Sequence, residues 1–207
     1  MQEELFRKLP GVNPPKTQLG WDKFNALAEA AERLFTASSF FEVSVSDICR
    51  AAHTAVGTFY IYFETKTDLY RYLVECYKRR IKQRLSESIA GCTTRCQRER
   101  EGIRGFVTFA MENPMLYNII WGSLAVDKQI FEDYYVSFAK SYARALIQDQ
   151  AELQSGDVTT LAYALMGISS FLGLRAIFES MPEAQIDRMI DETFLPMIRS
   201  GLIRPEE

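Results

Sequence analysis

The sequence has a single histidine, His53, and only four cysteines among its 207 residues. A zinc site needs three or four such ligands at suitable spacing, and a Ser-His-Asp arrangement needs a histidine that no turn already uses. The chain also lacks a glycine-rich phosphate loop and the motifs that mark an activated nucleophile. We therefore predict no catalytic residues, no bound metal and no cofactor, and we interpret the chain as a non-enzymatic protein.

Long uninterrupted apolar runs and a secretory leader are not expected either. The longest apolar stretches are interrupted by charged residues or are too short to span a bilayer, and the segment after Met1 is polar with mixed charge. The four cysteines are then interpreted as free thiols of a cytoplasmic protein. Cys92 and Cys96 lie one helical turn apart, so a redox switch or a metal clip is the alternative for that pair. We expect a cytoplasmic protein without a membrane partner.

Positive and negative charges are unevenly distributed along the chain. The formal net charge is −3. Residues 44–84 contain eight Lys or Arg and four Asp or Glu, which gives +4 and leaves −7 for the rest. This asymmetry favours a basic module that faces nucleic acid on an acidic body, although four net charges also occur on ordinary solvated surfaces.

Helical periodicity runs through most of the sequence, and no alternating strand pattern or internal repeat interrupts it. We predict an all-α fold with about nine helices. The sequence is divided into a flexible N-terminal arm at 1–16, a helix-turn-helix DNA-binding domain at 17–72 and a helical ligand-binding and dimerisation domain at 73–207. The predicted helices span 21–37, 44–52, 55–62, 65–90, 95–113, 114–122, 127–153, 157–179 and 182–201.

Two pairs of residues have the spacing of a capping box. Ser44 with Asp47, and Thr65 with Asp68, each place a hydroxyl three residues ahead of a carboxylate. Such a pair satisfies free backbone N–H groups at the beginning of a helix. We therefore predict helix starts at both positions, with the short helix 55–62 between them.

The turn between the first two of these helices is predicted at His53. A residue just past a helix end often adopts the left-handed conformation, which His tolerates better than a β-branched residue. Thr54 is then expected to cap the next helix. Two short helices joined by such a tight turn form a helix-turn-helix, whose second helix enters the DNA major groove.

The residues of this segment resemble the DNA-binding signature of the TetR/AcrR family of bacterial regulators. The resemblance covers residues 21–72, and beyond them only length and helical layout are similar. It implies a homodimeric transcriptional regulator, most often a repressor, that a small-molecule effector releases from a palindromic site on double-stranded DNA. The residues that carry the resemblance are Thr54, Gly57, Thr58, Phe59, Tyr60, Tyr62, Phe63, Lys66 and Leu69.

We predict that the DNA contacts divide by role. We expect phosphates to be contacted by hydroxyls near the first motif helix, by two tyrosines and by Lys66. The residues at the start of the second helix are expected to contact base edges. His53, Ala55 and Val56 depart from the commonest family pattern, and Val56 offers a thymine methyl an apolar contact but offers guanine no donor. The predicted DNA-binding residues are Ser44, Ser46, Thr54, Ala55, Val56, Gly57, Thr58, Tyr60, Tyr62, Thr65 and Lys66.

The second domain is rich in aromatic residues and methionine, which suits either an apolar ligand pocket or a plain helical core. The family resemblance favours a pocket for an apolar or amphipathic effector. An anionic head group could be received by Arg104, Arg144 or Arg175. The predicted ligand-binding residues are Phe106, Tyr117, Trp121, Phe138, Tyr142 and Met166.

The last two predicted helices carry the apolar stripes expected of a dimer interface, because a helix that is apolar all round needs cover on both sides. The alternative hypothesis is a dimeric helical module that binds DNA or protein without small-molecule control. The predicted interface residues are Leu161, Ile168, Phe171, Ile190, Phe194 and Met197.

Overall fold

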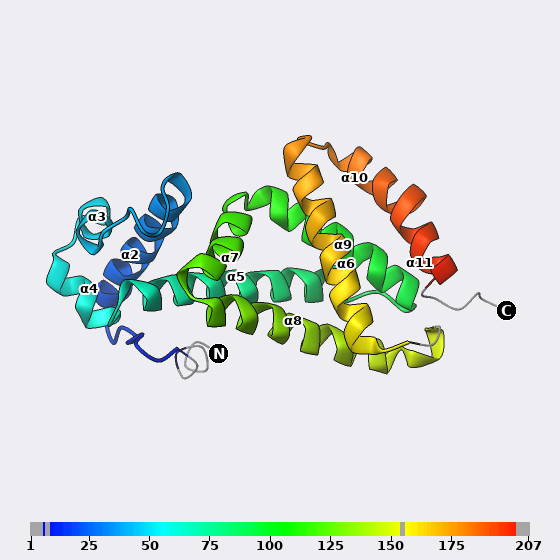
Figure 1. Cartoon of the computed structure of the whole chain (residues 1–207), viewed down its shortest axis with the longest axis horizontal. Coiled ribbons are helices and arrows are strands. Elements are labelled where there is room, and N and C mark those ends of the chain that lie inside the picture. The colour runs from blue at the N-terminus through cyan, green and yellow to red at the C-terminus, as the bar shows by residue number, and fades with distance from the viewer. Residues whose placement is uncertain (1–5, 7–8, 154–155, 202–207) are drawn as a thin grey trace. The chain divides into compact units, whose positions relative to one another are not determined.

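The computed structural model describes Phe6, residues 9–153 and residues 156–201. Counting α10, η2 and α11 as one helix with a π-helical turn, the described chain has nine helices and no sheet, as predicted (Figure 1). The elements are α2 (Gln18–Ala37), α3 (Val45–Ala51), α4 (Val56–Tyr62), α5 (Lys66–Ile89), α6 (Arg95–Glu112), α7 (Met115–Val126), α8 (Lys128–Gln148), η1 (Gln150–Glu152), α9 (Val158–Phe178), α10 (Glu183–Met189), η2 (Ile190–Phe194) and α11 (Leu195–Gly201).

The helices form two compact units. Unit 1 comprises Met1–Lys78 and Met115–Tyr134, and unit 2 comprises Arg79–Pro114 and Tyr135–Glu207. The grouping differs from a simple division near residue 72, because α7 and the first residues of α8 pack with the N-terminal helices. Local sequence patterns cannot show this, since α7 follows α6 along the chain but finds its contacts on α2.

The core of unit 1 is built from aromatic rings around Phe24, whose side chain is fully buried. The ring centre of Phe24 lies 4.8 Å from that of Phe63, 4.9 Å from that of Tyr72 and 5.6 Å from that of Tyr62. Helices α2, α4 and α5 therefore meet at one aromatic cluster. Offset and edge-to-face rings add to the stabilisation that burial of their apolar area provides.

Residues 9–13 are held against the segment between α4 and α5. The N–H of Asn13 donates to the carbonyl of Tyr62 at 2.8 Å, and the N–H of Glu64 donates to the carbonyl of Gly11 at 2.9 Å. An isolated antiparallel bridge joins Val12 and Phe63, and Val12 is buried. This part of the predicted flexible arm is thus ordered by backbone pairing, while residues 1–5 and 7–8 lie outside the described residues.

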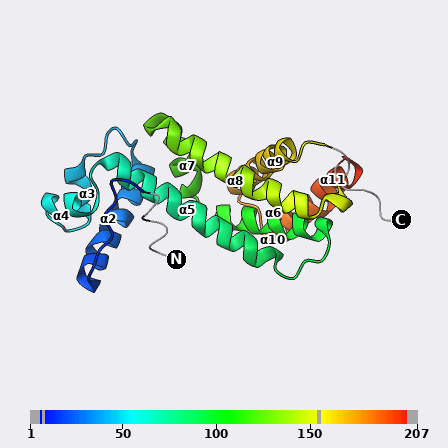
Figure 2. The same cartoon turned by 90° about the horizontal axis from the view of Figure 1, so that it is seen from below.

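Unit 2 is organised around α6, which packs against α9 and against the helix formed by α10, η2 and α11 (Figure 2). Its apolar core includes Val107 of α6, Leu146 of α8 and Ile190 of η2, all fully buried. Helix α9 buries only the narrow side that carries Ala162, Leu165, Gly173 and Ala176. The opposite side of α9 carries the exposed large apolar side chains of Tyr163, Phe171 and Phe178.

By length and composition, helix α9 could cross a membrane, and 22% of its most apolar 18-residue stretch is buried. The prediction that every long apolar stretch is interrupted by charge or too short to span a bilayer is therefore wrong for this helix. Length and composition alone do not assign α9 to a bilayer, because the core helix of a soluble protein passes the same test.

Candidate nucleic-acid interface

The beginning of α3 has the predicted capping box. The N–H of Asp47 donates to Oγ of Ser44 at 3.1 Å, and the N–H of Ser44 donates to Oδ2 of Asp47 at 3.0 Å. Hydrogen bonds from the Ser44 side chain and backbone lower the pKa of Asp47. Ser44 and Ser46 are both exposed at this helix start, where N–H groups and the helix dipole favour a phosphate oxygen.

The turn after α3 is a Schellman motif with His53 in the left-handed conformation, at φ 52°. The N–H of His53 donates to the carbonyl of Arg50 at 3.2 Å, and the N–H of Thr54 donates to the carbonyl of Cys49 at 2.9 Å. The prediction of a left-handed turn residue at His53 is confirmed. The turn sets the direction in which α4 leaves α3.

The N-cap of α4 is Ala55, which makes no side-chain cap hydrogen bond. The prediction that Thr54 caps this helix is wrong by one residue. Because the backbone of Thr54 completes the preceding turn, the helical geometry begins one position later. Ala55 has no hydroxyl that could satisfy the free N–H groups of the first turn, so those groups stay available to solvent or to DNA.

Helix α4 is two-faced. Its inner face carries Phe59, which is fully buried, and Tyr62, which is 8% exposed and packs on Phe24. Tyr62 therefore belongs to the core rather than to the predicted phosphate contacts. The outer face, termed here the α4 outer face, carries Val56, Gly57, Tyr60 and Ile61.

An open groove of about 350 Å³ lies beside this face, between α2 and the Schellman turn. Lys23 of α2 contributes a cation to the groove, and Thr58 of α4 contributes a hydroxyl. The predicted residues Thr54 and Ala55 also line it. The groove is lined by Asp22, Lys23, Ala26, Ala52, His53, Thr54, Ala55 and Thr58.

Helix α5 begins beside α4 with the second predicted capping box. The N–H of Thr65 donates to Oδ2 of Asp68 at 3.0 Å, and the N–H of Asp68 donates to Oγ1 of Thr65 at 3.2 Å. Lys66, predicted on a phosphate, instead donates from Nζ to the carbonyls of Phe40 and Val43, both at 2.6 Å. Burial lowers the pKa of Lys66.

The ammonium of Lys66 also lies 4.1 Å from the ring centre of Phe40. Carbonyl oxygens and a ring face together satisfy the cation, so the structure uses Lys66 to brace the connection between α2 and α3. The sequence reasoning missed this role, because carbonyl oxygens of a distant segment leave no sequence signal.

The predicted ligand-binding residues divide between the two units. Tyr117 and Trp121 lie on α7 in unit 1, with ring centres 5.5 Å apart, and Trp121 is 41% exposed. The four predicted ligand-binding residues in unit 2 are half-buried. One of them is Phe138, whose ring centre lies 5.2 Å from Nζ of Lys82. The four residues of unit 2 are Phe106, Phe138, Tyr142 and Met166.

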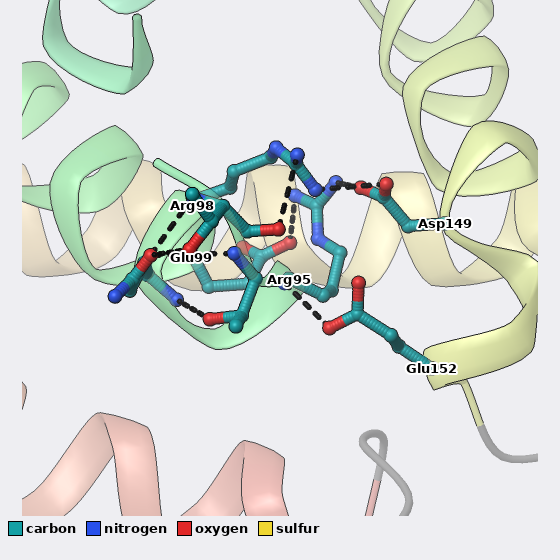
Figure 3. A network of polar contacts seen from close by, with 8 residues as sticks. Arg95, Arg98, Glu99, Asp149 and Glu152 are labelled. Carbon is teal, nitrogen blue, oxygen red and sulfur yellow. Dashed lines mark hydrogen bonds and ion pairs between the residues drawn. The ribbon is translucent and has the colours of Figure 1, made fainter. Parts of the chain in front are cut away.

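Unit 2 also contains a network of buried charges (Figure 3). Arg95 pairs with Glu99 and, at 3.0 Å, with Asp149, which directly follows α8, while Arg98 reaches Asp149 at 2.8 Å. The hydroxyl of Tyr142 donates to Glu99 at 2.6 Å. Burial raises the pKa of Tyr142 well above its ordinary value, and the negative charge of Glu99 adds to this effect.

The same network fixes the start of α6. The backbone N–H of Arg95 donates to Glu152 of η1 at 2.7 Å. Burial opposes the charge of Arg95, but Glu99, Tyr142 and Asp149 together more than offset it, and the pKa of Arg95 is raised. Arg104 and Arg175, predicted as receivers of an anionic head, instead pair with Asp187 at 2.7 Å and Glu179 at 3.0 Å.

The predicted dimer residues fall into two groups. Phe171 and Met197 are 67% and 49% exposed, and Leu161 and Ile168 are half-buried. Ile190 and Phe194 are 0% and 2% exposed, so they pack inside their own unit. The sequence reasoning missed Phe178, the most exposed large apolar residue at 79%, although it ends the same apolar run.

Among the described residues, no three His, Cys, Asp or Glu side chains lie close enough together to hold a metal ion. The four cysteines are free, and Cys49 is buried, which raises its pKa. Nε of Arg199 lies 3.2 Å from Sγ of Cys96.

The helix-turn-helix is also identified by comparison with known proteins. Residues 27–73 match the model of the bacterial regulatory proteins of the tetR family. These residues form a helix-turn-helix of the tetR family of bacterial regulatory proteins. The match begins in the middle of α2 and ends in α5, so it includes both capping boxes, the Schellman turn and all of α4.

Solved structures extend the similarity of fold over most of the chain. A TetR-family transcriptional regulator from Chloroflexus aurantiacus superposes with TM-score 0.66 and 21% identity over 98% of each chain. The fatty acid degradation regulator FadR from Bacillus halodurans gives 0.73 and 14%, with 88% of this chain and 97% of FadR covered. NalD of Pseudomonas aeruginosa, a repressor of a multidrug efflux pump, gives 0.70 and 16%, with 92% and 100% covered. No curated protein matches the sequence significantly.

TetR-family regulators are DNA-binding proteins without enzymatic activity, which agrees with the prediction from composition. Proteins of this family bind operator DNA and dimerise. The interface built from α3, the turn and α4 is accordingly the DNA-binding part of this regulator.

Proposed function

We propose that the protein is a cytoplasmic, homodimeric repressor that binds a palindromic operator and leaves it when an apolar or amphipathic small molecule binds. The observation that carries the DNA-binding part is the exposed α4 outer face, held beside two capped helix starts. The outer face is not needed for the protein's own core, since its side chains are exposed while Phe59 on the inner face is buried. It is therefore available to enter a major groove.

The dimer is proposed to form through α9 and the last helix. Phe171 and Phe178 expose two large rings on α9, and Met197 exposes a third apolar side chain on α11. Exposed aromatic residues and methionine are typical of interfaces between proteins. A second copy of the chain covers the apolar surface that a helix apolar on all sides would otherwise expose to water. In such a dimer the two copies of the DNA-binding unit are related by a two-fold axis.

The effector is proposed to contact the half-buried residues of unit 2, among them Phe106, Phe138 and Met166. Lys82 lies beside Phe138 and donates to Oγ of Ser141 at 3.2 Å, which places a cation next to apolar surface. An amphipathic anion combines both features. Two proteins that share the fold are FadR, a regulator of fatty acid degradation, and NalD, a repressor of a multidrug efflux pump.

Selection of bound sequences from a random duplex library tests the DNA-binding function. We expect an enriched palindrome with half-sites about 34–36 Å apart, as for other two-fold helix-turn-helix proteins. Affinity for that site should fall steeply with salt because bound phosphates release counterions. A protein that enriches no sequence would contradict the proposal.

A panel of fatty acids and amphipathic dyes tests effector control. A compound that raises the melting temperature of the free protein binds its native state. The same compound should weaken operator binding by a factor of about 5–150, and operator should weaken compound binding by the same factor. A bound compound that changes operator affinity less than twofold favours the alternative, a dimeric DNA- or protein-binding module without small-molecule control.

A further inference from the structure

The α4 outer face carries side chains of an unusual kind for reading DNA. Val56 is 43% exposed, Tyr60 54% and Ile61 61%. A Cβ built on Gly57 meets nothing within 4 Å, so packing within this chain does not require glycine there. The face thus presents two aliphatic side chains, one phenol and one bare stretch of backbone to whatever covers it.

These four residues share one face because of helical geometry. Val56 and Tyr60 are separated by four positions, as are Gly57 and Ile61, and residues four apart lie above one another on a helix. Phe59, on the opposite side, is fully buried in the aromatic core, which prevents α4 from turning another face outward. The outward direction of Val56 and Ile61 is therefore fixed by the core.

The side chains of this face cannot make the hydrogen bonds by which proteins usually recognise guanine and adenine. Guanine is best read by Arg or Lys, and adenine by Asn or Gln, through paired hydrogen bonds. The sequence of α4, VGTFYIY, contains none of these four residue types. Its exposed hydrogen-bonding side chain is the hydroxyl of Tyr60. Thymine differs from the other bases in the major groove by a methyl group, and apolar side chains recognise that group.

We propose that this regulator selects its operator through the methyl groups of thymines, which Val56 and Ile61 contact in the major groove. This inference rests on the proposed DNA-binding function and specifies its target as sites with thymine at the positions facing α4. Covering Val56 and Ile61 with methyl groups removes apolar surface of both partners from water. That gain supplies affinity without a hydrogen bond to any base.

Deoxyuridine provides the test, because it differs from thymidine only by the missing methyl group. An operator is first selected with the full-length protein, and each thymine is then replaced by deoxyuridine in turn. We expect about fourfold weaker binding per methyl group that α4 contacts, and about 15-fold for a symmetry-related pair. Fluorescence anisotropy of labelled duplexes measures both values.

Side-chain variants assign the methyl contact to α4. In Val56→Ala, replacing the thymine that faces residue 56 should change affinity less than twofold, because the partner of its methyl group is gone. Ile147→Ala, which truncates a 52%-exposed aliphatic side chain on α8, serves as the matched control and should keep the full effect. Since Val56 and Ile147 are both exposed, neither variant should lose its fold.

The possible failures are distinguishable. An enriched palindrome at which no deoxyuridine replacement weakens binding overturns the methyl readout and leaves the proposed function intact. Loss of the methyl effect in Ile147→Ala as well as in Val56→Ala also overturns it. Enrichment of no sequence at all overturns both proposals.

Discussion

The two units of this protein differ in where their ion pairs and their large aromatic rings lie. Unit 1 buries its aromatic rings around Phe24, and its capping carboxylates lie at helix ends. Unit 2 buries Arg95 and Glu99, at 4% and 3% exposure, and exposes Phe171 and Phe178. Both units thus have an apolar core, and unit 2 in addition keeps an ion pair inside and two large rings of α9 outside.

The difference indicates which unit is complete on its own. An aromatic core with capped helices needs no partner to satisfy it. Exposed rings on α9 leave apolar surface in water, which a second copy of the chain would cover. Buried ion pairs contribute little net stability but become costly when one partner is removed, so they hold α6 and α8 in one arrangement. Four experiments can break or sharpen this comparison.

Phe24→Ala should have the largest effect, a loss of about 3–5 kcal/mol in the free energy of unfolding, because it opens a cavity in the aromatic core. Urea denaturation measures this loss. Phe41→Ala, which removes a ring that is 67% exposed, is the control and should change the unfolding free energy by about 0.5 kcal/mol or less. Similar losses in the two variants would show that unit 1 does not depend on its ring cluster.

Glu99→Ala should cost about 3 kcal/mol, since it leaves the guanidinium of Arg95 buried without its nearest charge. Replacing both residues, as Arg95→Met with Glu99→Leu, should restore part of that loss because no unpaired charge remains at the pair. The matched control is Asp191→Ala, which breaks an exposed ion pair of Arg100 at 2.7 Å and should cost at most about 1 kcal/mol. A double variant less stable than the single one would contradict the argument.

Phe171→Asp combined with Phe178→Asp should convert the dimer into a monomer without unfolding it, because both rings are exposed within the chain. Operator affinity should then fall by about 100-fold or more, since one half-site alone holds each copy. Light scattering and anisotropy measure the two effects. Ile147→Asp introduces the same charge on α8, and an equal loss of dimer there would remove α9 from the interface.

The smallest effect concerns two residues in the left-handed conformation, one in each unit. His53 has φ 52° and Ser180 has φ 48°, and Ser180 ends α9 in a second Schellman motif. Replacing either by glycine should stabilise the protein by about 0.5–1 kcal/mol, because glycine adopts positive φ without steric cost. Thermal unfolding measures this gain. Only His53→Gly should also alter operator affinity, and an equal change in Ser180→Gly would argue against a role of the turn in binding.

Local sequence signals predicted the helices well because their causes are local. Ser44 with Asp47, and Thr65 with Asp68, form the expected boxes, and His53 occupies the expected turn. The cap of α4 was misplaced by one residue, because Thr54 has the right chemistry and only the geometry of the preceding turn excludes it. Spacing alone cannot distinguish these two positions.

Features that depend on distant segments were not predictable in this way. The apolar stripe with Ile190 and Phe194 indicated a buried face, but only the position of α6 shows that the face is covered within the same chain. Arg95 and Glu99, four residues apart, have the spacing of an ordinary solvated pair on a helix. The burial of this pair depends on a distant segment, in which Asp149 follows α8 and Glu152 belongs to η1, and both carboxylates bind Arg95.

The backbone pairing of residues 11–13 with the segment after α4 has a practical consequence for engineering. A fusion partner or a truncation just before Leu9, which is itself 3% exposed, acts on the chain directly behind the recognition helix. Reporter domains and purification tags placed at the N-terminus would therefore disturb the hydrogen bonds that position Tyr62 and Glu64. A biosensor built from this regulator should carry its reporter at the other end of the chain.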